Sequence, residues 1–253
     1  MQIGKHNGKL IELRKAARRG VLTASGLLPI EGPLLLEEAE RSGTQIVDVF
    51  LRSGAPRPAV VGVSVYDLTD EIFKTLQSTE HSQGVIATVR LREFNIKDTL
   101  TPSPALVIML CRIQDPGNVG TILRVGEAFG ATGCLALRET ASFHNGKLVR
   151  ASAGSLFRLP HVGSLELTET VQDLRSRGVF IVGTAPMAPS TIDVWDWRKP
   201  TALLVGNEGG GLNDAELHAC DAVLRIPQKP TVESLNSAVA TAVVLYEASK
   251  QRH

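Results

Sequence analysis

Short apolar runs alternate with amphipathic segments through the second half of the chain. Continuous apolar runs of this kind are typical of strands that are covered on both faces of a parallel sheet. They predict strands at Ala105–Leu110, Cys134–Leu137, Val179–Val182, Ala202–Val205 and Ala222–Ile226. Apolar positions at helical spacing lie between them, at Val119–Phe129, Lys147–Ser152, Leu167–Ser176 and Asp214–Ala219. Alternating strands and helices predict an α/β fold with a parallel sheet.

The residues before position 95 predict a smaller α/β unit. Residues 5–19 have the spacing of a basic amphipathic helix, with Leu10, Leu13 and Ala17 along one face. Further elements are expected at Gly26–Ile30, Leu34–Arg41, Ile46–Leu51, Ala59–Val63, Leu68–Leu76 and Val85–Val89. Residues 94–104 lose this periodicity and carry two prolines. We therefore expect a domain at 1–95, a linker at 96–104 and a second domain at 105–253.

The overall charge restricts how a polyanion could be bound. Hydrophobic residues make up 43% of the chain and charged residues 21%, and the formal net charge is +1. Affinity for nucleic acid would therefore have to come from local basic runs rather than from a global field. Two such runs occur, at residues 5–19 and 138–158. Each alone is more typical of a solvated helix face, but together they favour a polyanionic partner.

The cysteines and the apolar segments exclude several classes of protein. Three cysteines, widely spaced and in or beside apolar runs, predict reduced core thiols rather than disulfides or a zinc site: Cys111, Cys134 and Cys220. The six histidines show no ligand spacing, so we expect no metal. No apolar run approaches the length of a membrane span, and residues 1–20 lack the apolar core of a signal peptide. We expect a soluble, cytoplasmic protein with no membrane partner.

A first polar loop, from Gln114 to Arg124, follows the strand at 105–110 and starts a helix. Backbone N–H groups and the Asn118 amide should therefore face the carboxyl edge of the sheet, where ligands bind in open α/β sheets. Taken alone, Asn118 is more typical of a helix cap, and Arg124 of a surface pair with Glu127. The loop matches neither the Walker nor the dinucleotide-binding pattern.

Two further loops complete a candidate active site. Gly206–Gly211 contains four glycines around Glu208, and such a loop lets backbone approach a ligand closely. The third loop follows Ile226 and leads into a helix rich in small residues that is expected to begin near Ser234. Ser234 could cap that helix.

Together, these loops resemble the three motifs of the SpoU (TrmH) family of RNA ribose 2′-O-methyltransferases. The motifs read N-V-G-T-I-L-R from Asn118, G-N-E-G-G-G-L from Gly206, then I-P and E-S-L-N-S-A-V-A-T-A from Glu233. The resemblance covers residues 105–250. Two positions depart from the usual pattern: Gln228 stands where many members have methionine, and Ser237 where valine is usual. The segment around Ile30–Ala39 is similar to an L30e-type RNA-binding domain.

The resemblance implies a SPOUT-type fold, a parallel sheet with a C-terminal trefoil knot, preceded by the smaller L30e-like α/β domain. It implies S-adenosylmethionine (AdoMet) as cofactor, RNA as substrate and a homodimer whose interface includes the last helix. Cofactor binding is expected around Thr184, Gly206, Ile226 and Leu235. Carried over by motif position, the catalytic residues are Asn118, Arg124, Glu208, Ser234 and Asn236.

Guanidinium groups stay protonated in proteins, which makes Arg124 a poor acceptor for the ribose 2′-OH proton. We therefore expect Arg124 to bind the neighbouring phosphate, while a phosphate oxygen or water takes the proton. The L30e-like domain favours ribosomal RNA, because such domains suit structured loops with unpaired bases. Methylation of tRNA is the alternative, as is a non-catalytic RNA-binding protein that keeps the fold, although all five polar motif residues are present. A role in antibiotic resistance also stays open.

Overall fold

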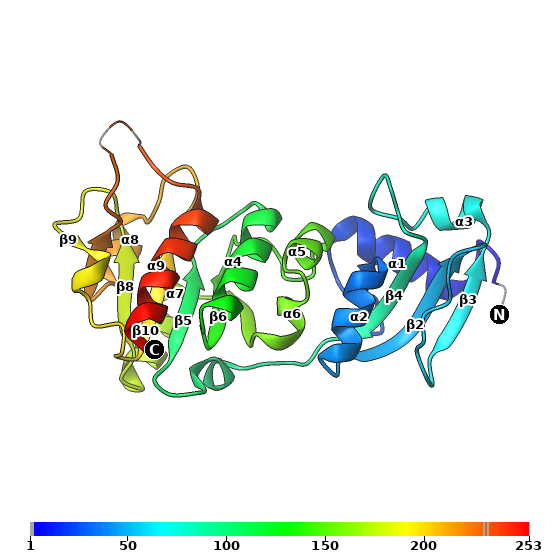
Figure 1. Ribbon diagram of the computed structural model, residues 1–253, viewed down its shortest axis with the longest axis horizontal. Coiled ribbons are helices and arrows are strands. Elements are labelled where there is room, and N and C mark those ends of the chain that lie inside the picture. Colours follow the sequence, from blue (N-terminus) through cyan, green and yellow to red (C-terminus); the bar gives the residue numbers. More distant parts are fainter. Residues whose placement is uncertain (1–2, 230, 232, 253) are drawn as a thin grey trace. The chain divides into compact units, whose positions relative to one another are not determined.

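The computed structural model describes residues 3–229, 231 and 233–252. The chain divides into two compact units (Figure 1). One comprises Met1–Glu93 together with Ser142–Arg158, and the other comprises Phe94–Ala141 together with Leu159–His253. In the described part of the chain, no helix has both the length and the apolar character needed to cross a membrane.

The first unit is built on a four-stranded sheet in the order β1-β4-β2-β3. Strands β1 and β2 run antiparallel to β4, and β3 runs parallel to β2. Its core contains Phe50, Tyr66, Phe73 and Ile86. The elements are α1 (Gly8–Arg19), β1 (Leu28–Glu31), α2 (Pro33–Arg41), β2 (Gln45–Arg52), β3 (Ser64–Leu68), α3 (Asp70–Lys74), β4 (Val85–Arg90), α5 (Gly146–Ala151) and α6 (Ser155–Arg158).

The expected basic helix is α1. The side chain of Asn7 accepts a hydrogen bond from the backbone N–H of Lys9, and Gly20 ends the helix with a φ of 63°. Such a left-handed residue at a helix end is most readily glycine. Leu10 and Leu13 are buried as expected, and Ala16 is the buried alanine of this face.

The strand predicted at Ala59–Val63 is wrong. Those residues form an irregular segment in which Val61 is 93% exposed and Gly62 has a φ of 73°. The strand, β3, follows directly after them. Tyr66 in β3 is buried and stacks on Phe50 of β2, with 5.3 Å between ring centroids. Cross-strand packing of this kind stabilises a strand more than an apolar run without a partner does.

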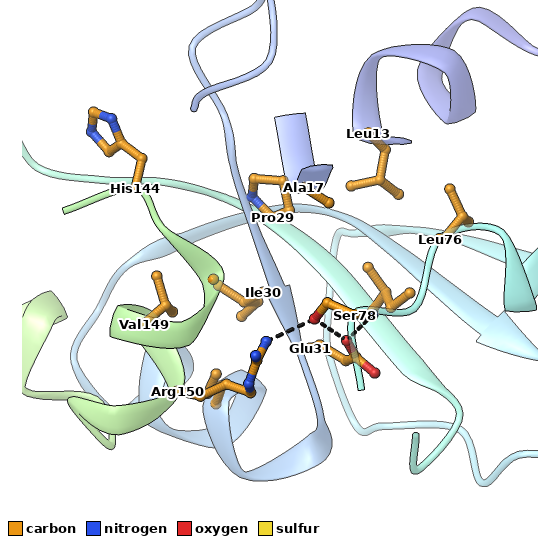
Figure 2. A pocket seen from close by; sticks show the side chains of 13 residues that line it. Leu13, Ala17, Pro29, Ile30, Glu31, Leu76, Ser78, His144, Val149 and Arg150 are labelled. Atoms are coloured by element: carbon orange, nitrogen blue, oxygen red, sulfur yellow. Dashed lines mark hydrogen bonds between the residues drawn. The ribbon is translucent and has the colours of Figure 1, made fainter. Parts of the chain in front are cut away.

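Residues 142–158 pack into the first unit, although the residues before and after them belong to the second (Figure 2). The guanidinium of Arg150 donates to the hydroxyl of Ser78 over 2.7 Å, and Ser78 donates to Glu31 from its hydroxyl at 2.6 Å and its backbone at 2.7 Å. Burial acts to raise the pKa of Glu31, but hydrogen bonds from Ser78 and Thr79 outweigh it and lower that pKa. Arg158 pairs with Glu38 at 2.6 Å.

The second unit contains a seven-stranded sheet in the order β7-β6-β5-β10-β8-β11-β9, and each neighbouring pair is parallel. The predicted parallel sheet is therefore confirmed. The elements are η1 (Ile96–Leu100), β5 (Leu106–Leu110), α4 (Pro116–Ala128), β6 (Gly133–Leu137), β7 (His161–Leu165), α7 (Leu167–Ser176), β8 (Phe180–Thr184), β9 (Ser190–Thr191), η2 (Ile192–Val194), β10 (Thr201–Val205), α8 (Asp214–His218), β11 (Ala222–Arg225) and α9 (Ser237–Arg252).

The segment expected to be a linker carries ordered structure. Asn95 and Asp98 form a capping box at the start of η1, and Thr99 within it is fully buried. A Cβ placed on Gly133 would lie 2.3 Å from the Cβ of Thr99. Glycine at the start of β6 thus allows η1 to pack directly on the second sheet.

The strand order brings the candidate loops to one edge. Strand β10 lies between β5 and β8, and β11 pairs with the far side of β8. Because all these strands are parallel, the loops after β5, β10 and β11 leave from the same carboxyl edge. Helix α9 packs against α4, and the two are drawn in red and green in Figure 1.

Candidate active site

The loop after β5 places Asn118 inside a helix rather than at its cap. The side chain of Asp115 caps α4 by accepting a hydrogen bond from the N–H of Gly117 at 2.7 Å, and Pro116 occupies the first turn, where its missing N–H is tolerated. The prediction that Asn118, taken alone, caps the helix is therefore wrong. Its side chain is left available for contacts with other loops.

The loop after β10 is a tight hairpin. Asn207 and Gly211 exchange backbone hydrogen bonds of 3.1 and 2.9 Å, and the Asn207 side chain accepts a bond from the N–H of Gly209 at 2.9 Å. Gly206 must be glycine, because an added Cβ would lie 2.3 Å from the carbonyl carbon of Gly211 and 2.5 Å from the nitrogen of Leu212. The loop therefore closes on itself at its first residue.

The third loop leads into α9 three residues later than expected. The helix begins at Ser237, and its cap is Asn236, whose side-chain oxygen accepts from the N–H groups of Ala238 at 2.9 Å and Val239 at 3.3 Å. Ser234 lies before the helix and is exposed, so it does not cap it. Asn236 suits this position because its side-chain oxygen accepts from the first N–H groups of the helix, while its side-chain nitrogen can still donate a hydrogen bond elsewhere.

Three of the five predicted catalytic residues are joined by hydrogen bonds. Asn118 donates to the carboxylate of Glu208 at 3.0 Å, and Asn236 donates to the side-chain oxygen of Asn118 at 3.1 Å. The hydrogen-bonded trio Glu208–Asn118–Asn236 thus joins Asn118 to two residues that lie 90 and 118 positions further along the sequence. Because Glu208 can only accept when ionised, it fixes which way the Asn118 amide faces.

A cavity of about 350 Å³ opens at the carboxyl edge of the sheet. All four residues predicted to bind cofactor line it, together with Glu208 and Ser234 from the predicted catalytic set. Most of its wall is backbone and small or aliphatic side chains, and two carboxylates face it. The lining includes Thr184, Ala185, Val205, Gly206, Glu208, Gly210, Ile226, Glu233, Ser234, Leu235 and Ala240.

Arg124 is not part of this network within one chain. It is exposed on α4, six residues after Asn118, and the described residues provide it with no hydrogen bond or ion pair. The expected surface pair with Glu127 does not form. The side chains of Arg124 and Ser234 are thus exposed to solvent, whereas those of Glu208, Asn118 and Asn236 are hydrogen-bonded to one another.

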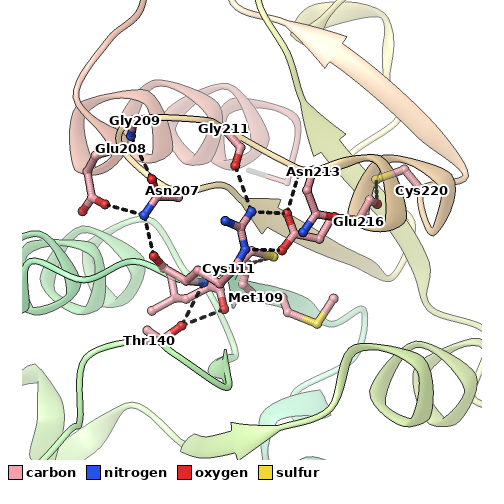
Figure 3. Close-up of polar contacts among 12 residues, drawn as sticks. Met109, Cys111, Thr140, Asn207, Glu208, Gly209, Gly211, Asn213, Glu216 and Cys220 are labelled. Atoms are coloured by element: carbon pink, nitrogen blue, oxygen red, sulfur yellow. Dashed lines mark hydrogen bonds and ion pairs between the residues drawn. The ribbon is translucent and has the colours of Figure 1, made fainter.

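Asn207 lies at the candidate site but is not among the residues that the sequence predicts there. Its side-chain amide donates to the backbone oxygen of Arg112 at 2.8 Å and lies 3.4 Å from the second carboxylate oxygen of Glu208 (Figure 3). It therefore ties the glycine loop to the segment that follows β5. The available signal was an amide inside a glycine run, a residue type that bonds readily to nearby backbone.

The cysteines take no part in the candidate chemistry. Cys111 and Cys134 are buried, Cys220 is half-buried, and none of them forms a disulfide. Burial raises the pKa of Cys220 to about 11, and burial also raises the pKa of the other two thiols. Neutral thiols are poor nucleophiles and poor metal ligands. They act as small core residues, as the sequence predicts.

Comparisons with known proteins agree with the geometry. A model of the SpoU rRNA Methylase family matches residues 105–246. The chain is 31% identical over 242 residues to the 23S rRNA (guanosine(2553)-2'-O)-methyltransferase RlmP of Bacillus subtilis, covering 95% of each chain. It is also 31% identical over 219 residues to the 23S rRNA (guanosine-2'-O-)-methyltransferase RlmB of Ralstonia nicotianae, covering 85% of this chain and 86% of that one.

Solved structures fall into two groups by coverage. The AdoMet-bound rRNA methyltransferase from Sinorhizobium meliloti aligns with a TM-score of 0.86 at 26% identity, over 99% of this chain and 97% of that one. The methyltransferase AviRb from Streptomyces viridochromogenes, in complex with AdoMet, aligns with a TM-score of 0.85 at 25% identity, over 97% and 99%. A structure concerned with 2-OH methylation of C/U34 on tRNA aligns with a TM-score of 0.54 at 25% identity, over 59% of this chain and 98% of that one.

Proposed function

The chain belongs to the SpoU rRNA Methylase family, and on that premise we propose that it methylates the 2′-hydroxyl of one ribose in 23S-type ribosomal RNA. It is an AdoMet-dependent RNA ribose methyltransferase. The observation that carries the proposal is the hydrogen-bonded trio Glu208–Asn118–Asn236, of which Glu208 lines the cavity after β10. The trio brings three separate motifs to one place.

The cavity suits AdoMet in size and chemistry. Its volume of about 350 Å³ lies in the range of small-molecule sites. Gly206 contributes backbone to its wall, because an added Cβ there would clash with the backbone of Gly211 and Leu212. Ile226 and Leu235 offer aliphatic surface for a flat purine. The carboxylates of Glu208 and Glu233 complement a cationic sulfonium. We propose that Thr184, Gly206, Ile226 and Leu235 hold the cofactor.

AdoMet supplies an electrophilic methyl group, so the protein must mainly align the reactants and manage one proton. The bond from Asn118 to Glu208 leaves the Asn118 oxygen to accept from Asn236, so each amide has one defined orientation. We propose that this trio, with the accessible hydroxyl of Ser234, orients the ribose. Arg124, which is exposed, binds the adjacent phosphate through its two parallel N–H groups, and a phosphate oxygen or water accepts the proton.

Arg124→Lys tests the phosphate contact. Lysine keeps the positive charge but cannot present two N–H groups in one plane, so we expect the kcat for methyl transfer to fall by about 10²-fold. Steady-state kinetics with tritiated AdoMet and ribosomal RNA would measure it, with the AdoMet Kd as a control that should not change. Near-normal turnover would contradict a contact in which two N–H groups of Arg124 bind the phosphate.

The share of this chain that aligns with each of the similar solved structures favours ribosomal RNA over tRNA as the substrate. The rRNA methyltransferase of Sinorhizobium meliloti aligns with nearly the whole chain, whereas the structure concerned with tRNA aligns with 59% of it. We propose that residues 1–95, with the inserted residues 142–158, form an L30e-like domain that binds the ribosomal RNA. Residues 96–104 lead from it into the catalytic domain, which comprises the rest of residues 105–253. The same whole-chain likeness supports a C-terminal trefoil knot.

We propose that the protein acts as a homodimer through the outer faces of α4 and α9. A shallow apolar groove there is lined by Val125, Phe129, Val239, Val243 and Tyr246 with their small neighbours. Val239 is 51% exposed and Tyr246 55% exposed, which is unusual for side chains of this kind gathered on one face. A second copy of the same face would bury them.

Val243→Glu should therefore convert the dimer to a monomer, because it would bury a carboxylate in an apolar interface. Sedimentation velocity at micromolar concentration would show the change. The matched control is Val61→Glu, since Val61 is 93% exposed and belongs to the first unit, whereas α4 and α9 belong to the second. A monomeric wild-type protein, or a dimeric Val243→Glu variant, would contradict the proposed interface.

Ribose methylation mapped across total RNA tests the proposed function as a whole. Cells that lack the protein should lose one 2′-O-methyl group in 23S rRNA, and the wild-type chain should restore it. Glu208→Gln should not restore it, because the amide cannot accept from both Asn118 and Asn207. Loss of a tRNA methyl group would favour the tRNA alternative, and full rescue by Glu208→Gln would favour a non-catalytic role.

A further inference from the structure

Arg112, the residue two positions after β5, has an unusual backbone conformation. Its φ is 58°, in the left-handed region that a residue with a side chain rarely adopts. The backbone N–H donates to the hydroxyl of Thr140 at 3.1 Å, which holds the peptide in place. Such strain persists only where surrounding contacts impose it, and it is concentrated at functional sites.

The side chain of Arg112 contacts the far end of the glycine loop. Its guanidinium forms two bonds with the carboxylate of Glu216, at 3.0 and 2.8 Å, and a third with the backbone oxygen of Gly211 at 3.3 Å. Its own backbone oxygen accepts from the side chain of Asn207 at 2.8 Å (Figure 3). Arg112 therefore bonds to both residues that close the hairpin.

Glu216 holds the guanidinium in that position. It is only 3% exposed, and one of its carboxylate oxygens also accepts from the N–H of Asn213 at 2.8 Å, so its orientation is fixed by the start of α8. A buried carboxylate needs a cationic partner, and a two-bond pair with arginine is directional. The bond to Glu216 raises the pKa of Arg112, so the guanidinium keeps its charge.

We propose that Arg112 and Glu216 are positioning residues that set the geometry of the glycine loop for AdoMet. By bonding to both ends of the hairpin, they fix the Gly206 backbone beneath the cofactor cavity. They also fix Glu208, which lies between the two ends and bonds Asn118. Neither residue lines the cavity, so they act only through the loop. The inference rests on the proposed cofactor cavity, and it adds residues from outside the three motifs.

The experiment compares Arg112→Gly, Glu216→Gln and the wild type by calorimetric titration with AdoMet. Glycine adopts the left-handed conformation without strain. The gain from relieving that strain in Arg112→Gly therefore offsets part of the stability lost with the guanidinium. Glu216→Gln is nearly isosteric, but both oxygens of Glu216 accept from Arg112, so in either orientation the amide nitrogen would face an N–H group of Arg112. We expect the AdoMet Kd to rise about tenfold in both variants, and kcat at saturating AdoMet to fall in both.

The matched control is Arg175→Met. Arg175 pairs with Asp221 at 2.7 Å and also donates to a backbone oxygen, that of Ala219, but it touches no residue of the glycine loop. It should lower the thermal midpoint and leave the AdoMet Kd unchanged. A general loss of rigidity would instead raise the Kd in all three variants, which would overturn the proposal.

The Kd values separate failure of this inference from failure of the proposed cavity. Gly206→Ala serves as the reference, because its methyl group would force apart the backbone of the loop that lines the cavity. If Gly206→Ala abolishes binding while Arg112→Gly and Glu216→Gln stay within about threefold of the wild-type Kd, the positioning role is wrong and the cavity stands. If Gly206→Ala binds AdoMet like the wild type, the proposed cavity is wrong, and the positioning role is wrong with it.

Discussion

Gly206→Ala is expected to abolish detectable AdoMet binding and to lower methyl transfer at least about 10²-fold. The added methyl group would lie 2.3 Å from the carbonyl carbon of Gly211 and 2.5 Å from the nitrogen of Leu212. Both are backbone atoms in a closed hairpin, so they cannot rotate away as a side-chain end could. The loop must open, which moves Glu208 away from Asn118. Calorimetric titration with AdoMet and a methyl-transfer assay would measure the two losses.

The stability of the same variants checks the steric reason. Forcing a methyl group into closed backbone costs about 1–3 kcal/mol or more, so the free energy of unfolding should fall by that order in Gly206→Ala. Gly210→Ala adds a methyl group in the same loop, where no atom lies within 4 Å. Its free energy of unfolding should match that of the wild type. Equal losses in the two variants would show that the effect does not come from the contact with Gly211.

Arg252→Ala is expected to lower the free energy of unfolding by about 2–4 kcal/mol, more than any other substitution of a partly exposed residue in the second unit. At the end of α9, the guanidinium donates to four backbone oxygens, those of Pro104, Ala105, Trp197 and Lys199, at 2.6 to 3.1 Å. These oxygens flank the starts of β5 and β10. Burial lowers the pKa of Arg252, yet the group stays charged at neutral pH. Urea unfolding followed by tryptophan fluorescence would measure the loss.

Lys250→Ala provides the comparison at the same helix end. Lys250 pairs with Glu247 at 2.8 Å and is exposed, and exposed pairs contribute little. Its urea midpoint should equal that of the wild type. A similar shift in both variants would mean that the helix end tolerates no truncation, and that the four carbonyl contacts of Arg252 are not the cause.

The buried parallel strands were predictable because their signal is local. The predicted helix Leu167–Ser176 matches α7 at both ends, and the apolar runs at 105–110 and 202–205 became β5 and β10. Strand β7, at His161–Leu165, was missed. It lies at the edge of the sheet and is half-buried to exposed throughout, so it lacks the apolar run that marks the central strands.

Helix starts were less predictable because several residues can cap. Asp115 caps α4 and Asn236 caps α9, whereas the pattern pointed to Asn118 and Ser234. Each segment offers more than one side chain of the capping type within four residues, and sequence alone does not rank them. The choice depends on which residue is needed elsewhere, as Asn118 is for its bond to Glu208.

The hydrogen-bonded trio was predictable in its members but not in its hydrogen bonds, and neither the separate position of Arg124 nor the contacts of Asn207 were predictable. Motif order identified Glu208, Asn118 and Asn236, yet nothing in the sequence says that Asn118 bonds to both of the others. The pair Arg112–Glu216 gave no signal at all, because its members lie 104 residues apart and neither belongs to a motif. Long-range ion pairs of this kind follow from the fold and do not reveal it beforehand.

The insertion of residues 142–158 into the first unit has a consequence for synthesis on the ribosome. Domains generally fold as units in the order in which they emerge. Here the N-terminal unit cannot be completed when residue 93 has emerged, since α5 and α6 follow β5, α4 and β6 of the other unit. The nascent chain must therefore hold an unfinished β1 surface while the first strands of the catalytic sheet are made, and pulse-labelled proteolysis should find residues 1–93 protected only after residue 158 has left the exit tunnel.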